Sequence, residues 1–373
     1  MKKVILFLIA ACVMMTSCKK TDSGEAEEVK TSVHVSFDCA ESFTDSGELY
    51  INDSGILTFV DRRSGISTPL CSKPDCKHEG VSSANPKPEC SAYVEGSCYA
   101  PAIYGGKLYF MYTPDAKDSS YEGFGVKILC RADKDGTNRR EIARLDNAQT
   151  VSTAAYGDGM FACGVYKDFD DKGESLEKRE CYAAVIDPES GRIYKTPVYS
   201  GYNGIIRNIC TDDKKMYFAY TYTTEQISKN DEEYIKSIIR TEIICFDRDE
   251  GTVKTLYTAH GDCADIGYGY ARINEEKPYT VDLSTGEKTT LENDLTAYKM
   301  TDKGIVMYGD SFYLCDTQGG KTKLETEEMS IAAITDSYIY VLKSEGKDTV
   351  LGVMDKSDFL SGKKAEIKKL REV

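Results

Sequence analysis

The stretch IICFDRDEG, residues 243–251, decides the fold because variants of it recur along the whole chain. Each copy is an apolar run that ends in Asp, and in most copies a Gly follows within four residues. Asp can hydrogen-bond its own backbone and Gly can adopt positive φ, which is the chemistry of a hairpin loop between two strands. The last of the seven copies lacks the nearby Gly. The seven aspartates are Asp61, Asp133, Asp187, Asp247, Asp282, Asp316 and Asp355.

A second strand with alternating aromatic residues precedes most copies, as in GGKLYFMY (105–112) and SYIYVLKS (337–344). Shorter apolar runs come before those strands, so each unit offers four short strands joined by turns. The aspartates lie about 49 residues apart on average, a little above the ~40–45 residues of a four-stranded propeller blade. We therefore predict an all-β chain that forms a β-propeller with seven four-stranded blades. A pair of β-sandwiches is the rival architecture, and six or eight blades would follow if an end unit is miscounted.

The N-terminus has the pattern of a targeting segment, because two lysines precede twelve apolar residues, Val4–Met15. A transmembrane helix needs about 20 apolar residues, so this shorter run is typical of a secretory signal peptide. Thr and Ser come directly before Cys18, and small residues followed by Cys resemble the lipobox of bacterial lipoproteins. That resemblance implies a signal peptide of residues 1–17 and a diacylglycerol group on Cys18. Met15 departs from the usual Leu of a lipobox, and an ordinary signal peptide with an incidental cysteine is the alternative.

Residues 18–32 are polar and poor in apolar groups, so we expect a disordered tether between the lipid and a folded domain of residues 33–373. No second apolar run of spanning length follows Cys18. The sequence therefore predicts a chain that the lipid alone anchors to the cell membrane, on its extracytoplasmic face. The net charge of −14 argues against nucleic acid as a partner, because like charges repel. We also expect a monomer.

An insertion at residues 71–98 contains Cys71, Cys76, His78 and Cys90. Three thiolates and one imidazole form the ligand set of a tetrahedral structural zinc site, and zinc could order a loop that has few apolar residues. Disulfides are the competing interpretation, because an exported protein can form them. A reactive or redox role is the third.

Other cysteines lie inside expected strands, where they have the pattern of small buried hydrophobes, and a chain with so many free thiols is more typical of a reducing habitat. These are Cys130, Cys163, Cys181, Cys210, Cys245 and Cys315.

These motifs resemble uncharacterised β-propeller lipoproteins of anaerobic Gram-positive bacteria. The resemblance lies in the lipobox, in the Asp-x-x-Ser/Thr-Gly hairpins, and in Pro-Leu-Cys followed by Cys-x-His and Cys after the first blade. More loosely, the blades are similar to those of TolB-like propellers. The resemblance covers most of the mature chain and implies a fold and a location, but no particular activity.

The sequence contains no Gly-x-Ser-x-Gly elbow, no His-Glu-x-x-His and no P-loop, so it indicates no catalytic residue. Propellers present a broad face of loops. We therefore predict a non-enzymatic binding or scaffold module for an unknown protein, peptide or glycan. The alternative is an extracytoplasmic hydrolase or lyase that acts on a polysaccharide or peptide through carboxylates in the propeller channel.

Overall fold

A computed structural model describes most of the chain after residue 40. The predicted signal peptide, lipid site and tether, residues 1–32, lie outside the described part, as does the start of the expected folded domain at residue 33. No helix among the described residues is long and apolar enough to span a bilayer. The described ranges are 41–114, 126–146, 148–157, 159–170, 172–212, 214–291, 295–316, 320–324 and 329–373.

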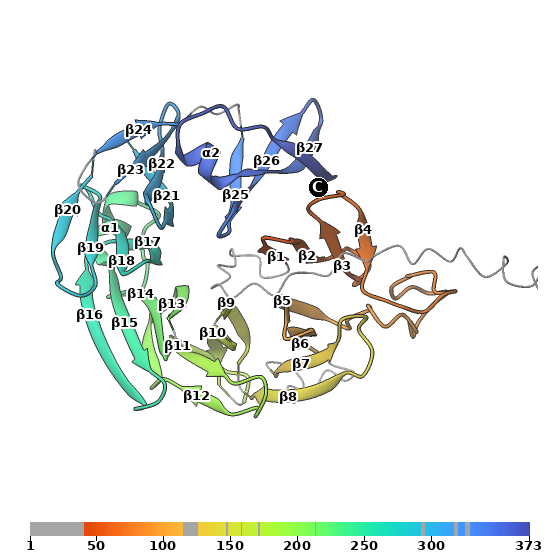
Figure 1. Ribbon diagram of the computed structural model, residues 1–373. Coiled ribbons are helices and arrows are strands. Elements are labelled where there is room, and N and C mark those ends of the chain that lie inside the picture. Colours follow the sequence, from red (N-terminus) through yellow and green to blue (C-terminus); the bar gives the residue numbers. More distant parts are fainter. Residues whose placement is uncertain are drawn as a thin grey trace, which may run out of the picture.

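Antiparallel sheets follow one another around a common centre, and each is built from strands that are consecutive in the chain (Figure 1). The first sheet contains β1 (Glu41–Thr44), β2 (Gly47–Ile51), β3 (Leu57–Asp61) and β4 (Ser67–Pro69). The second contains β5 (Ser97–Tyr104), β6 (Lys107–Thr113), β7 (Lys127–Asp133) and β8 (Arg140–Leu145).

An eight-stranded sheet comes next. Its first half is β9 (Thr150–Gly157), β10 (Met160–Phe169), β11 (Ser175–Ile186) and β12 (Ile193–Lys195). Its second half is β13 (Tyr199–Asp212), β14 (Lys215–Thr223), β15 (Ile239–Asp247) and β16 (Thr252–Ala259). The halves join because β11 pairs with both β12 and β13.

Three more four-stranded sheets complete the ring. The first of them contains β17 (Asp262–Gly267), β18 (Tyr270–Asn274), β19 (Tyr279–Asp282) and β20 (Lys288–Thr290). The second contains β21 (Thr296–Thr301), β22 (Gly304–Tyr308), β23 (Phe312–Cys315) and β24 (Lys321–Lys323). The third contains β25 (Ser330–Ile334), β26 (Tyr338–Glu345), β27 (Asp348–Asp355) and β28 (Lys368–Glu372). The helices are α1 (Glu232–Ile238) and α2 (Lys356–Leu360).

This architecture confirms the predicted all-β propeller. When the eight-stranded sheet is divided between β12 and β13, the described strands fall into seven sets of four, which is the number of blades that the sequence predicts. The short helices lie outside these sets. Asp231 begins α1 by accepting a hydrogen bond from the Tyr234 N–H, so the acidic connection between β14 and β15 is partly helical.

The core is distributed between neighbouring sheets. Leu129 of β7, for example, packs in one buried cluster with Phe161 and Val165 of β10. The expectation that the strand cysteines are buried holds for four of the six. Cys210 and Cys245 are instead partly exposed.

Among the described residues, the first and last sheets share no strand, and contacts that involve side chains join them. Phe43 of β1 packs against Tyr340 of β26, with ring centroids 4.9 Å apart. Arg371 of β28 binds Glu48 of β2 through Nε and Oε2, which are 2.7 Å apart. Figure 1 accordingly shows the C-terminus beside the first sheet.

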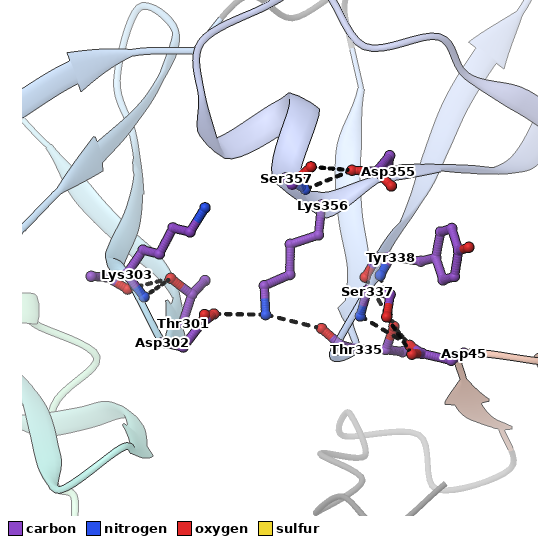
Figure 2. A network of polar contacts seen from close by, with 11 residues as sticks. Asp45, Thr301, Asp302, Lys303, Thr335, Ser337, Tyr338, Asp355, Lys356 and Ser357 are labelled. Carbon is purple, nitrogen blue, oxygen red and sulfur yellow. Dashed lines mark hydrogen bonds and ion pairs between the residues drawn. The ribbon is translucent and has the colours of Figure 1, made fainter. Parts of the chain in front are cut away.

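Polar contacts link the turns between the first and second strands of three successive sheets (Figure 2). The Asp45 carboxylate accepts hydrogen bonds from the hydroxyls of Thr335 and Ser337, at 2.5 and 2.6 Å. The Lys356 ammonium lies 2.7 Å from the Asp302 carboxylate and also donates to the Thr335 carbonyl at 3.3 Å. These bonds fix the sheets that contain β21, β25 and β1 to one another.

Most of the hairpin aspartates bond their own turn as the sequence predicts, whereas Asp133 bonds the Lys107 and Asn138 side chains and Asp355 caps α2. Asp282 accepts hydrogen bonds from the Ser284 hydroxyl and from the N–H groups of Ser284 and Thr285, at 2.6 to 3.0 Å. Gly286 follows with a φ of 76°. The Ser284 hydroxyl and these two N–H groups hold the pKa of Asp282 below its usual value of 3.8.

We expect the free energy of unfolding to rise with pH across the acid range, because the unfolded chain binds more protons than the folded chain there. The contribution of Asp282 is complete above pH 3.8 and disappears as the pH falls through the lower pKa of the folded state. Asp282→Asn keeps the acceptor but cannot titrate, so urea denaturation between pH 3 and 6 should show a shallower pH dependence. Glu276→Gln is the control, and an equal slope in the two variants would contradict this role.

Candidate metal centre and adjoining groove

The insertion at residues 71–98 joins β4 to β5, and it is packed into the protein at its ends and at Gly80, which is buried against Ser54. Leu70 and Ala92 hydrogen-bond to the backbone of Leu57, and Val94 bonds to Gly55 in the first sheet. Between these anchors most side chains are exposed. The middle of the loop therefore depends on something other than apolar burial for its order.

The predicted ligands converge in this middle part. The ligand atoms of Cys71, Cys76, His78 and Cys90 all lie within 4.8 Å of one another. The Cys90 Sγ and the His78 Nδ1 are 3.5 Å apart, so the imidazole faces the thiols and not the solvent. His78 adopts a φ of 53°, a left-handed conformation that is uncommon for residues other than Gly but that His adopts more often than most.

This geometry suits a tetrahedral metal ion. A tetrahedron with Zn–S bonds of about 2.3 Å has edges of about 3.8 Å, so small side-chain movements would bring all four atoms to bonding distance. The three cysteines have free thiols in the structure, and the histidine lies among them. The four residues can therefore hold a metal ion such as zinc, as the sequence predicts.

The electrostatics of the cluster favour the thiolate form of one cysteine even before a metal binds. Burial acts to raise the pKa of Cys71, but hydrogen bonds from Ser91 and from the backbone N–H of Lys73 outweigh it and lower the pKa to about 6. Burial raises the pKa of Cys90 to about 11. Metal binding would deprotonate this second thiol, so affinity for a metal should increase with pH.

The β7–β8 hairpin supports the cluster from the second sheet. Arg139 donates hydrogen bonds to the backbone carbonyls of Gly136, Tyr93 and Ser91. The Ser91 hydroxyl in turn donates to the Asp135 carbonyl at 2.6 Å. A Cβ atom on Gly136 would come within 2.0 Å of the Ser91 carbonyl oxygen, so this hairpin glycine is needed for close approach as well as for its φ of 71°.

A groove of about 860 Å³ lies between the insertion and the second sheet. The insertion contributes Pro86, Pro88 and Tyr93 to its lining. Tyr112 of β6 and Glu141 of β8 come from the second sheet. The sequence did not indicate this groove, because its residues come from separate elements that only the packing of loop on sheet brings together.

Of the other histidines, His34 lies outside the described residues. His260 is exposed, and its backbone N–H donates to the Glu275 carboxylate at 2.9 Å. The cluster at residues 71–90 is therefore the place where the described chain gathers candidate ligands.

Comparisons with known proteins agree with this fold. No family model and no curated protein matches the chain. Its backbone is similar to the β-propeller domain of the Trilobed protease from Pyrococcus furiosus, which is described as having an open velcro topology. The TM-score is 0.52 at 11% sequence identity, and the match covers 92% of this chain and 97% of that one. A prolyl endopeptidase gives a TM-score of 0.47 at 13% identity, covering 75% of this chain and 43% of that one. Dipeptidyl peptidase 4 from Porphyromonas gingivalis gives 0.44 at 10% identity, covering 92% and 59%. At these identities the likeness shows the fold alone, and that fold is the β-propeller.

Proposed function

We propose that this protein is a lipid-anchored binding module on the extracytoplasmic face of the cell membrane. In this proposal a structural zinc ion, held by Cys71, Cys76, His78 and Cys90, orders the insertion. The ordered insertion forms one wall of the groove in which a protein, peptide or glycan binds.

One observation carries the proposal: the four converging ligands lie in the same loop that forms one wall of the groove. Cys90 lines the groove itself, and Tyr93 lies three residues after it. Metal–ligand bonds supply the order that a loop with mostly exposed side chains cannot obtain from packing. A fixed wall lowers the entropy that a ligand must overcome when it binds.

Elemental analysis and thiol titration of the protein purified without a reductant test the metal. We expect about one zinc ion per chain, because three thiolates and one imidazole complete a tetrahedral site. Cys76→Ser should lose that zinc. Cys245→Ser removes a partly exposed thiol from β15 and should retain it. Protein without metal and without free thiols in the insertion would instead support the disulfide alternative.

Membrane fractionation tests the anchor. Cys18→Ala should release the protein from membranes or block its processing, because the lipid is the only membrane attachment in this proposal. Cys12→Ala, within the signal, is the matched control and should leave the mature protein on the membrane. If the cleaved Cys18→Ala protein still sediments with membranes, the lipid is not the anchor.

A hydrolase or lyase stays the alternative function. Two exposed carboxylates, Glu95 and Glu141, line the groove. The Arg144 guanidinium bonds Glu141 and holds its pKa below the usual range. A general acid in glycoside hydrolysis needs the opposite shift, so this carboxylate favours binding over catalysis.

A further inference from the structure

A smaller pocket of about 330 Å³ lies on the second sheet and adjoins the groove through Arg140, which lines both. Polar side chains in its lining come from Lys107 of β6, Arg131 of β7, Asn138 of the β7–β8 turn and Arg140 at the start of β8. Asp133 contributes a carboxylate to the same lining. The pocket therefore contains three cationic side chains in a protein whose net charge is −14.

Two of these cations face each other. Arg131 and Arg140 are directly opposite partners in the antiparallel pairing of β7 with β8, so their side chains lie on the same face of the sheet. Like charges in this arrangement repel each other and destabilise the strand pair.

The carboxylates around the pocket do not relieve this repulsion. Asp133 bonds the Lys107 ammonium at 2.5 Å and the Asn138 amide at 2.7 Å. Glu141 bonds Arg144 at 2.8 Å. Within the described ranges, neither Arg131 nor Arg140 forms an ion pair. Among the described residues, the two guanidinium groups thus face each other in a concave site without an ion-pair partner of their own.

We infer that this pocket binds the oxyanion of a ligand, either a carboxylate or a phosphate group. Guanidinium groups recognise such groups through paired, charge-assisted hydrogen bonds, and a bound oxyanion would neutralise the repulsion between the two arginines. The inference deepens the proposed binding function and rests on it, but it does not depend on zinc.

The position of the pocket also suits an extended ligand. Because Arg140 lines both cavities, an anionic group in the pocket would place the rest of the molecule against Tyr93 and Tyr112 in the groove. Tyrosine rings offer an apolar face with a polar tip, which fits the body of a sugar or a peptide. The expected ligand class is therefore an acidic glycan or peptide, or its phosphorylated counterpart.

Titration of the full-length protein with inorganic phosphate and, separately, with glucuronate tests the pocket at constant ionic strength. We expect saturable binding of at least one of them, and the tighter one identifies phosphate or carboxylate as the source of the oxyanion. Arg131→Gln/Arg140→Gln should weaken that binding by at least about tenfold, because it removes both guanidinium groups. Without ligand the same variant should have a higher Tm than the parent, because the repulsion is gone.

Arg63→Gln is the matched control, since it removes an exposed guanidinium from the turn between β3 and β4 and should bind like the parent. The inferred oxyanion site would be contradicted if the parent and the double variant bound the oxyanion equally. It would also be contradicted if chloride bound as tightly as the oxyanion. Failure to bind either oxyanion at tens of millimolar would also overturn it. The zinc content and the membrane fractionation would then still decide the proposed function independently.

Discussion

Arg371→Met is expected to lower the free energy of unfolding by about 3–5 kcal/mol, because it would leave the buried Glu48 carboxylate without its partner. The Glu48 side chain is 0% exposed and that of Arg371 is 14% exposed. The guanidinium also reaches Glu41 at 3.4 Å and lies 4.3 Å above the Tyr50 ring. This one residue of the last strand therefore contacts three side chains of the first sheet. Urea denaturation at pH 7 measures the loss.

Two further variants serve as controls for this prediction. Arg144→Met breaks an exposed pair of the same type, with side chains 47% and 44% exposed, and should cost only about 0–1 kcal/mol. Arg371→Met/Glu48→Met replaces both buried charges and should recover most of the loss, because no unpaired carboxylate remains. If Arg371→Met destabilises no more than Arg144→Met, the pair does not hold the ring closed.

The second large effect should follow removal of zinc. We expect a chelator to speed tryptic cleavage after Lys77 in the exposed loop by at least about tenfold, because in the proposed function the metal supplies most of the local stability of this loop. His78→Ala should be cleaved rapidly without any chelator. Mass spectrometry of the fragments over time measures both rates.

Cleavage elsewhere in the chain provides the internal control. Lys172 lies in the exposed turn between β10 and β11 and should be cut at the same rate with and without zinc. The thermal transition of the propeller should change little, since Cys90, Ala92 and Val94 remain packed against the first two sheets. Equal cleavage of the loop in both states would mean that disulfides or packing order it.

The repeat and the convergence of the four candidate ligands could be predicted because their signals are local. An Asp bonded to its own turn, as at Asp282, can be recognised within five residues. The four ligands likewise lie within one insertion, so their spacing alone suggested that they meet.

The groove, the arginine pocket and the ring closure could not be predicted, because each depends on register or on distant partners. Arg131 faces Arg140 only because a bulge at Leu129 and Cys130 shifts the pairing of β7 with β8. Glu48 carries a charge in an alternating strand and so resembles a surface residue, yet its partner lies 323 residues away. Sequence periodicity contains no information about such pairs.

Among the described residues the ring closes without strand exchange, which also has a consequence for how the chain folds. Every sheet consists of consecutive strands, so each can form as soon as its own segment has emerged, without waiting for the C-terminus. Contacts of very large sequence separation, such as the 290 residues between Asp45 and Thr335, arise only at the final seam. The entropy of joining the two ends is therefore lost in one late step, after the local strand pairs have formed.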